Sequence, residues 1–360
     1  MKKKACIITI TDYNFGNRLQ HYAVISLLRK ERFRVYSLKN YGNNLGFKIN
    51  QSILYNFKNG IKLFIRIMLG AITKTYRRYW LFAKFNLNTK MRWINKKKIV
   101  KNKNRFDLFV CGSDQIWNPC FFSDLFNNMA GFVKDEKKIA IAPSIGVDKI
   151  EDYQKEEFLK YINDFDYLSC REESGSKILE KLCNKSVSTI LDPTLMIEAE
   201  EWEFLSKKPS FSNKLNDFML IYFLGNMTND YKEKIKQISE KFSLKIVDIS
   251  DQCSEFSKIG PSEFLWLIKN CSIVLTDSYH GSIFSYIFNK PLKIFKRIDD
   301  NKSMDSRFDT LIGKLKIKNC LIEENMNLDR IFDINYDKSH LEYERMVFNR
   351  YFREAISKNE

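Results

Sequence analysis

Short, nearly continuous apolar runs alternate along this chain with segments whose apolar residues recur at helical spacing. In the first half, strands are predicted at residues 5–10, 34–38, 107–114, 138–144, 167–173 and 187–194, and helices at about 17–30, 151–163 and 174–182. In the second half, strands are predicted at 217–225, 244–249, 271–278 and 291–296, and helices at 228–242, 261–269, 281–289 and 337–357. Because apolar runs separated by helices are typical of parallel strands buried on both faces, the pattern predicts an α/β fold.

The polar stretch 198–216 interrupts this alternation, which resumes after it, so it marks the expected link between two domains. A chain of 360 residues with 44% apolar residues is long enough for two cores. We expect two doubly wound Rossmann-like domains, residues 1–205 and 206–360, facing a cleft. The charged last helix is expected to cross back onto the first domain.

The N-terminus and the cysteines indicate the compartment. The sequence MKKKACIITI contains an apolar run that is too short for a signal peptide, so we interpret it as the first strand of a cytoplasmic protein. Eight cysteines without a CxxC pair fit reduced, mostly buried thiols, and we expect neither disulfides nor a metal site. We identify no stretch that is long and uncharged enough to span a bilayer.

The net charge of +16 is concentrated in one segment. Residues 32–106 contain 19 of the 60 Lys and Arg residues and none of the 44 Asp and Glu residues, so the rest of the chain is close to neutral. We interpret residues 40–105 as a basic helical insertion into the first domain. Apolar residues recur in it at helical spacing, among basic ones, at Ile61, Phe64, Ile65, Met68, Leu69, Ile72, Tyr76, Tyr79 and Trp80.

This insertion has three interpretations. A basic amphipathic helix with aromatic residues is typical of peripheral contact with a membrane surface, here through residues 60–105. The alternative is a helical flap on the first domain whose lysines extend into solvent. Nucleic acid is a third class of partner for a basic segment, but no nucleic-acid motif accompanies it and no such binding is expected.

Polar residues cluster where the predicted strands end. The clusters are TDYNFGNRLQ (11–20), GSDQIWN (112–118), PSIG (143–146), REES (171–174), DPT (192–194), LGN (224–226) and DSYHG (277–281). In open parallel sheets, ligands bind beyond the carboxyl ends of the strands, where helix N-termini also point. Helix caps and turns use the same residue types, so any single cluster also has a structural explanation. Together, the clusters favour a binding site at this edge.

The candidate site residues of the first strand ends are Asn14, Gly16, Asn17, Arg18, Gly112, Ser113, Asp114 and Trp117. The stretch around Gly16 lacks the full glycine pattern of a dinucleotide loop, but a helix that begins there would offer backbone N–H groups and Arg18 to an anion. Trp117 beside a carboxylate and amides suits a sugar ring, and a core tryptophan is equally compatible with the pattern.

The remaining candidates are Arg171, Gly225, Asn226, Ser278, His280, Gly281 and Ser282. Arg171 follows a strand that should be buried, so it needs a partner, either Glu172 or Glu173 or a bound anion. His280 comes just after a buried strand, at the start of a helix. A bound phosphate or carboxylate would favour its protonated form and make it a proton donor, and the alternative is a structural histidine.

The ordered blocks NFGNRLQHYAV, DLFVCGSDQIWN, SIG, REESG, LDPTL and DSYHGSIFSYIFNKP resemble the polysaccharide pyruvyl transferase family over about residues 6–296. The resemblance implies the two-domain glycosyltransferase-B (GT-B) architecture. It also implies transfer of the enolpyruvyl-derived group of phosphoenolpyruvate to two hydroxyls of a sugar, which gives a pyruvate ketal and phosphate. The acceptor would belong to a capsule or exopolysaccharide, or to its lipid-diphosphate-linked precursor, and no cofactor is expected.

By this resemblance, His280 handles the proton, Arg171 holds the phosphate or carboxylate, and Asp114 is the candidate base on the hydroxyl side. The first domain would bind the acceptor and the second the donor. Some members carry an arginine where this chain has Ser278, so another cation would complete the donor site; the candidates are Arg18, Lys293 and Arg297. The alternative functions are a nucleotide-sugar-dependent glycosyltransferase of the same architecture and a non-catalytic protein that binds glycans or membranes.

Overall fold

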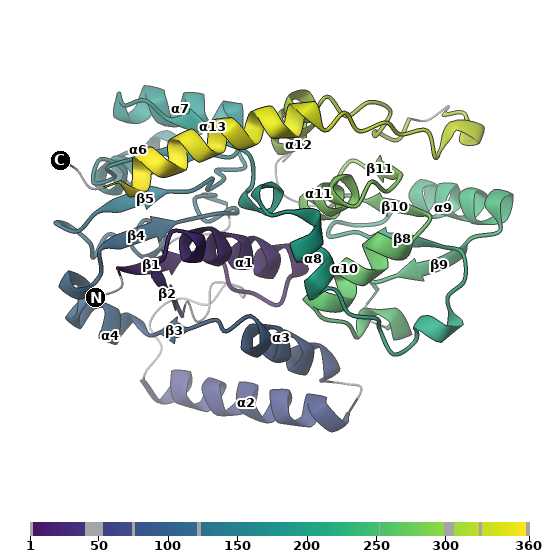
Figure 1. The fold of residues 1–360 in the computed structure, drawn as a ribbon, viewed down its shortest axis with the longest axis horizontal. Coiled ribbons are helices and arrows are strands. Elements are labelled where there is room, and N and C mark those ends of the chain that lie inside the picture. Colours follow the sequence, from purple (N-terminus) through teal and green to yellow (C-terminus); the bar gives the residue numbers. More distant parts are fainter. Residues whose placement is uncertain are drawn as a thin grey trace.

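The computed structural model describes residues 3–39, 53–73, 76–120, 124–251, 253–298, 306–323 and 326–357, and of these only the backbone for 53–60. The parts of the predicted basic insertion at 40–52 and 74–75 lie outside the described residues. Two parallel sheets, each covered by helices, stand side by side (Figure 1). The predicted α/β fold with two Rossmann-like domains is therefore confirmed.

The first sheet has the strand order β3–β2–β1–β4–β5, with all neighbours parallel. Its strands are β1 (Lys4–Ile8), β2 (Arg34–Leu38), β3 (Trp93–Ile94), β4 (Leu108–Cys111) and β5 (Lys138–Ala140). A bridge from β5 leads to the parallel pair β6 (Ser169–Cys170) and β7 (Ser188–Thr189). The helices of this half are α1 (Phe15–Lys30), α4 (Lys96–Lys101), η1 (Lys103–Arg105), α5 (Leu125–Asn128), α6 (Asp152–Ile162), α7 (Glu173–Cys183) and η2 (Pro193–Met196).

The second sheet has the order β11–β10–β8–β9, again parallel. Its strands are β8 (Phe218–Tyr222), β9 (Lys245–Asp248), β10 (Ile273–Thr276) and β11 (Leu292–Ile294). Its helices are η3 (Ser212–Lys214), α9 (Asn229–Phe242), η4 (Glu255–Ser257), α10 (Pro261–Asn270), α11 (Tyr279–Ile287), α12 (Ser306–Leu315) and η5 (Leu328–Arg330). Thr276 pairs with both Tyr222 and Ile294, so the segments after β8, β10 and β11 meet at one edge.

The described residues between 61 and 80 belong to two helices, whereas the apolar spacing over this stretch predicts one. Helices α2 (Ile53–Ile72) and α3 (Arg77–Asn88) pack against each other, with α2 on the outside of the molecule (Figure 1). A Cβ at Gly70 would collide with the carbonyl of Tyr76 and lie 3.0 Å from Cβ of Trp80, so this glycine lets the helices approach closely. The apolar spacing continues on both sides of the turn and therefore does not reveal it.

One apolar core joins the two halves of the molecule. The ring of Phe15, at the start of α1, lies 5.8 Å from Phe82 of α3, 5.6 Å from Tyr222 of β8 and 4.8 Å from Phe264 of α10. Since the same ring packs against elements of both halves, their contact is apolar and continuous rather than a polar surface contact.

The predicted link and the last helix complete this contact. Helix α8 (Ala199–Leu205) occupies part of the stretch 198–216, and its Trp202 is fully buried against Phe284 of α11. Helix α13 (Ser339–Ile356) runs back across the first sheet (Figure 1), where the Tyr351 hydroxyl donates to the carbonyl of Ala140 at 2.5 Å.

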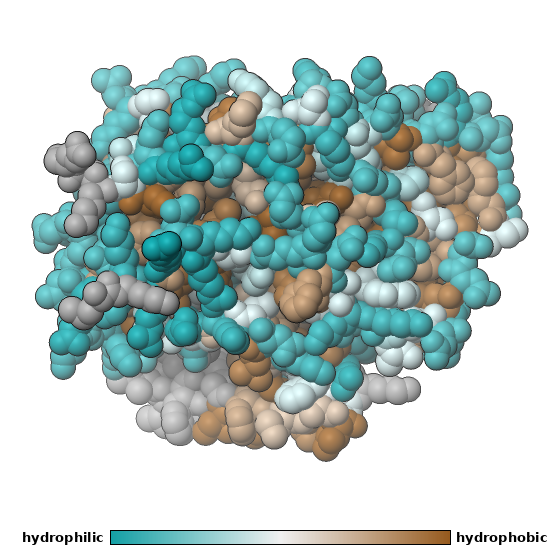
Figure 2. All heavy atoms as spheres, in the orientation of Figure 1, coloured by the Kyte–Doolittle hydropathy of each residue, from teal (hydrophilic) through white to brown (hydrophobic). Residues whose placement is uncertain are grey.

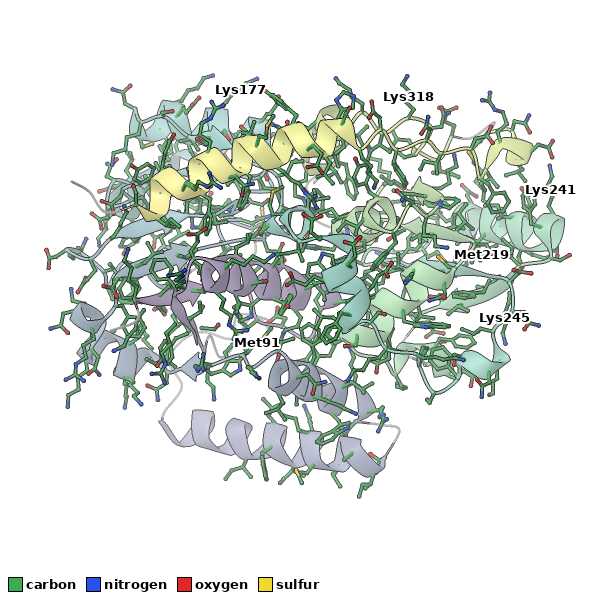
Figure 3. All side chains as sticks on the ribbon, viewed as in Figure 1. Met91, Lys177, Met219, Lys241, Lys245 and Lys318 are labelled. Atoms are coloured by element: carbon green, nitrogen blue, oxygen red, sulfur yellow. The ribbon has the colours of Figure 1, made fainter. Side chains whose placement is uncertain are left out.

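Burial of the remaining side chains follows their chemistry. All eight cysteines are unpaired, and five of them are buried. Met219 lies inside the second sheet, whereas Lys177, Lys241, Lys245 and Lys318 extend from the surface (Figure 3). Within the part of the chain that is described, none of the helices combines the length and the apolar character needed to cross a bilayer.

Candidate active site

The N-termini of α1 and α11 meet at His280. Asn14 caps α1 by accepting a hydrogen bond from the N–H of Asn17 at 3.2 Å, and Ser278 caps α11 by accepting one from a backbone N–H at 3.3 Å. Gly16 packs so closely on the imidazole that a Cβ at this position would collide with the ring. Because helix N-termini carry partial positive charge, this meeting point between the two halves is suited to an anion.

A buried carboxylate holds the imidazole of His280, which is 6% exposed. Its Nε2 lies 3.5 Å from Oδ2 of Asp192 and has no closer hydrogen-bond partner among the described residues. Oδ2 of Asp192 also accepts from the Ser113 hydroxyl at 3.1 Å and from Nη1 of Arg171 at 2.8 Å. Oδ1 accepts from the N–H and the hydroxyl of Thr194, at 3.0 and 2.7 Å. A carboxylate fixed in this way orients the imidazole.

Arg171 is fully buried and ion-paired, but not with its sequence neighbours. Its partners are Asp192 and Asp114, whose Oδ1 lies 3.5 Å from Nη2. The carboxylate of Glu172 instead accepts two backbone N–H groups after β5, at 2.8 and 2.9 Å. The predicted pairing of Arg171 with Glu172 or Glu173 is therefore wrong, because its partners Asp114 and Asp192 follow other strands.

Burial and charge act in opposite directions on this pair. Burial alone would lower the pKa of Arg171, but Tyr279 and the neighbouring carboxylates raise this pKa above its ordinary value. Burial alone would raise the pKa of Asp192, but the contacts with His280 and Arg171 hold it below its ordinary value. Both groups are therefore charged at neutral pH, directly beside the imidazole.

Two carboxyl groups follow the neighbouring strands β4 and β1. Asp114 has a left-handed backbone (φ 72°), and its Oδ1 accepts the N–H of Gln115 at 2.8 Å. Its buried Oδ2 has no hydrogen-bond partner within the described chain. Burial and then the charge of Asp114 raise the pKa of Asp12 to about 6, against the opposing charge of Arg18. Because its Oδ2 has no such partner among the described residues, Asp114 keeps an acceptor oxygen available, as a base requires.

Gly225 and Asn226 belong to a loop that Asp277 organises at the end of β8. The Asp277 carboxylate accepts the N–H groups of Leu224 and Gly225 at 2.7 and 2.8 Å. Asn226 donates its own N–H to a carbonyl of the segment after β11 at 2.6 Å. Nε of Arg297 lies 3.6 Å from Asp277, which brings this arginine to the same strand edge.

Gly281 and Ser282 support the start of α11 from inside. A Cβ at Gly281 would lie 2.8 Å from Oγ1 of Thr276, so the glycine permits close approach to the strand. The hydroxyl of Ser282, which is fully buried, donates to the carbonyl of Ser278 at 3.2 Å. The side chain of Ser282 therefore holds the helix turn rather than facing outward.

The three basic candidates for replacing the arginine absent at Ser278 differ in position. Nη2 of Arg18 donates to two carbonyls of the loop after β1, at 2.9 and 3.2 Å. Nζ of Lys293 donates to a backbone carbonyl after α12. Arg297 is the candidate beside Asp277, which directly precedes Ser278 in the chain. The structure thus brings Arg297 to the start of α11, whereas Arg18 bonds to the loop after β1 and Lys293 to the segment after α12.

Arg307 of α12 is a further cation in this region. It is 5% exposed, and its guanidinium lies 5.7 Å from the ring centroid of Tyr279, the ring that Arg171 approaches to 4.3 Å. Burial first, and then the charges of Arg171 and Arg297, lower the pKa of Arg307 to about 10. Two guanidinium groups, those of Arg171 and Arg307, therefore lie against the ring of Tyr279, next to His280.

The structure corrects the interpretation of Trp117 as a sugar platform. Trp117 is fully buried, with its ring edge-on to Phe165 at 5.4 Å, because it points into the core behind the sheet. Gly112 has φ 117°, and a Cβ there would collide with a neighbouring backbone carbonyl. Gly112 therefore permits the backbone turn that leads to Asp114, and Ser113 donates its hydroxyl to Asp192.

Sequence reasoning missed Asp192, Asp12 and Arg307. Asp192 lies in LDPTL and Asp12 in the polar cluster after the first strand, so both could have been selected as carboxylates at strand ends. Arg307 belongs to none of the motifs, and no signal in the sequence links it to His280. Only the packing of α12 brings it there.

Other features of the described chain do not add to this site. No group of three or more His, Cys, Asp or Glu side chains in the described ranges could hold a metal ion. A basic cavity of about 1150 Å³ lies at the amino ends of β1 and β2, lined in part by Lys3, Arg29, Arg34 and Arg92. Because ligands of open parallel sheets bind at the carboxyl ends, the site around His280 is the better candidate.

The fold and this site define a class of protein, the two-domain α/β proteins of the GT-B type. An uncharacterized protein from Klebsiella pneumoniae is similar at 12% identity and a TM-score of 0.50, over 89% of this chain and 93% of that chain. A proposed UDP-N-acetylglucosamine 2-epimerase from Listeria monocytogenes is similar at 11% identity and a TM-score of 0.52, over 98% and 95%. At these identities, the likeness shows the fold alone.

The sequence narrows this class to a family. The family model described as polysaccharide pyruvyl transferase matches residues 14–292, which include His280, Asp192 and Arg171. The chain therefore belongs to the polysaccharide pyruvyl transferase family, as its motifs predict, and the family supports a transferase that acts on polysaccharide. No curated protein matches the chain.

Proposed function

We propose that this protein transfers the enolpyruvyl-derived group of phosphoenolpyruvate to two hydroxyls of a sugar, forming a pyruvate ketal and releasing phosphate. The observation that carries the proposal is the buried cluster of His280, Asp192 and Arg171 where two helix N-termini meet, within the family match. A donor with a phosphate and a carboxylate needs cations and helix N-termini, and the transfer needs an acid and a base.

Three arginines form the anion site for the donor in this proposal. Arg171 already shares its charge with Asp114 and Asp192, so a donor with two anionic groups needs further positive charge nearby. Arg297 and Arg307 supply it, since both lie close enough to act on the same buried region. Guanidinium groups suit this role because they bind phosphate and carboxylate oxygens in pairs.

The same side chains account for each proton that moves in the reaction. As the first sugar hydroxyl oxygen bonds to carbon 2 of the donor, His280 gives a proton to carbon 3 and Asp114 accepts the hydroxyl proton. The bond from carbon 2 to the phosphate oxygen then breaks. The second hydroxyl oxygen bonds to carbon 2, and its proton leaves with the phosphate. Asp192 is a positioning residue that keeps the imidazole oriented.

The acceptor and location belong to the same proposal. The acceptor is a sugar of a capsular or extracellular polysaccharide, or of its lipid-diphosphate-linked precursor, and the reaction takes place in the cytoplasm. Asn14, Gly16 and Asn17 would face the acceptor from the first domain. The transfer needs no cofactor, because the donor itself carries the phosphate that leaves.

Phosphate release and mass spectrometry of sugar acceptors test this function. We expect phosphate release that needs both phosphoenolpyruvate and a lipid-linked or free galactoside, glucoside or mannoside. His280→Asn should lower the rate by roughly 10²- to 10⁴-fold, the usual contribution of a positioned acid or base. The matched control is His340→Asn, which changes a half-buried histidine of α13 and should leave the rate unchanged. Full activity of His280→Asn would refute the role of this histidine.

The same assay tests the anion site. Arg307→Gln should raise KM for phosphoenolpyruvate about tenfold, since a charge-assisted contact to the donor is lost. Arg330→Gln, at an exposed ion pair, is the control. Thermal-shift measurements should show stabilisation by phosphoenolpyruvate. Stabilisation by uridine diphosphate alone, with no ketal formed on any acceptor, would instead favour a nucleotide-sugar glycosyltransferase.

A further inference from the structure

Helix α2 carries a continuous apolar stripe on its outer side. The stripe consists of Ile61, Phe64, Ile65, Met68, Leu69 and Ile72, which are all exposed, with Phe64 at 64% and Ile72 at 83%. These positions follow the spacing of one helix face. The stripe accounts for the brown surface over α2 in Figure 2, at the edge of an otherwise mostly polar face. Large contiguous apolar surfaces of this kind mark interaction sites.

The opposite side of α2 is already occupied by its own domain. Leu63, Ile67 and Gly70 lie on the side that is less exposed, and Gly70 packs against Trp80 of α3. The stripe is therefore not the face by which α2 attaches to the protein. It is a second apolar face that packs against none of the described elements.

The charged residues around the stripe indicate which kind of surface it fits. Lys62 and Arg66 flank it on α2, and Arg77, at the start of α3, donates to the carbonyl of Ala71 at 3.5 Å, near the end of α2. The whole segment from 32 to 106 contains no Asp or Glu. An apolar face with a cationic border matches the surface of an anionic bilayer, where acyl chains lie below negatively charged headgroups.

The same charge argues against a second copy of this chain as the occupant. Two stripes facing each other would bring together two segments that lack any carboxylate, and the like charges would repel. A membrane-spanning role does not fit α2 either, since no described helix has the required length and apolar character. An interfacial helix that lies in the plane of the membrane needs only one apolar face.

We propose that the stripe of α2, with Lys62 and Arg66 beside it, docks the protein on an anionic lipid surface. The docking surface includes neither His280 nor the carboxyl edge of the first sheet, so docking is separate from the donor chemistry. It would hold the enzyme beside acceptors that are themselves attached to lipid.

Sedimentation of the full-length protein with vesicles tests the proposal. We expect binding to vesicles of phosphatidylcholine with phosphatidylglycerol, weaker binding to phosphatidylcholine alone, and weakening by salt because surface charges are screened. The double variant Phe64→Glu/Ile72→Glu changes two exposed positions and should reduce binding about tenfold or more. Phe204→Glu, which changes an equally exposed residue of α8 (87%), should bind like the wild type.

Each alternative outcome is decisive. If the wild type stays in solution with anionic vesicles, or if the double variant binds as well as the wild type, the stripe is not a lipid-docking surface. If lipid-free ultracentrifugation finds a dimer that the double variant abolishes, the occupant is a second copy and the lipid proposal is overturned. Phosphate release on a free sugar should be unchanged in the double variant, so a failure of docking is distinguishable from a failure of the proposed activity.

Discussion

Asp192 is the residue on which the geometry of the site depends most. It is fully buried, and the side chains of Ser113, Arg171 and Thr194 hydrogen-bond to its carboxylate while His280 approaches it. Since its pKa lies below the ordinary value in the folded protein, its contribution to stability is present at neutral pH and is lost as the pH falls. Loss of this carboxylate would leave Arg171 without its closest partner, which is costly in a buried position.

The stability that Asp12 contributes depends on pH in the opposite direction. Its folded pKa of about 6 is above the ordinary value, so the stability it contributes is present below pH 4 and lost as the pH rises through about 6. Asp12→Asn should therefore be more stable than the wild type at pH 8, by about 1–2 kcal/mol after allowance for partial exposure. Urea unfolding at pH values from 4 to 8 measures this difference. A constant difference over this range would contradict the shift.

At the scale of elements, the site depends on where helices begin. Helix α1 begins at Phe15 and α11 at Tyr279, each about two residues before the position predicted from apolar spacing, because Asn14 and Ser278 provide the caps. The earlier starts place Gly16 and His280 in the first turns of their helices. The two halves of the molecule therefore touch through a glycine and an imidazole.

Gly16→Ala tests this contact between the helices. The added methyl group would collide with His280, so we expect a loss of about 1–3 kcal/mol in the free energy of unfolding and lower activity. Gly313→Ala is the matched control, since nothing lies within 4 Å of a Cβ at that position of α12. It should be neutral or stabilising by up to about 1 kcal/mol. Urea unfolding compares the two; a Gly16→Ala variant as stable as Gly313→Ala would show that the close contact is absent.

At the scale of the whole molecule, the two sheets share one apolar core. Phe15 connects α1 with β8 and α10, and α13 returns from the second half to pack over the first sheet. Domains that share a large apolar interface are coupled more strongly than domains joined by a polar surface. The two halves are therefore expected to lose their structure together.

Calorimetry tests this coupling. We expect a single heat-absorption peak for the wild type, because unfolding either half exposes the shared core. Phe15→Ala should shift that single peak to lower temperature, with a loss of about 3–5 kcal/mol typical of a buried phenylalanine. Ile246→Ala, at an exposed position of β9, is a control expected to have little effect. Two separate peaks, of which only one moves in Phe15→Ala, would contradict the coupling.

The sequence by itself determined the α/β class, the two parallel sheets and the family. These follow from the periodicity of apolar residues and from motifs, which are properties of neighbouring positions. It also identified His280 and Asp114 as candidates, because polar residues at strand ends can be read directly from the chain. Their assignment to catalysis remains a prediction.

The tertiary structure alone decided which groups meet and which faces are covered. Asp192 reaches His280, and Arg307 reaches Tyr279, only because separate strand ends and helices pack at one edge. Apolar spacing predicted a single helix from 61 to 80, but α2, which ends at Ile72, has two apolar faces, and only packing against α3 shows which one stays exposed. The physical reason is that local pattern fixes the direction of a side chain relative to its own element, whereas burial and partners depend on residues distant in the chain.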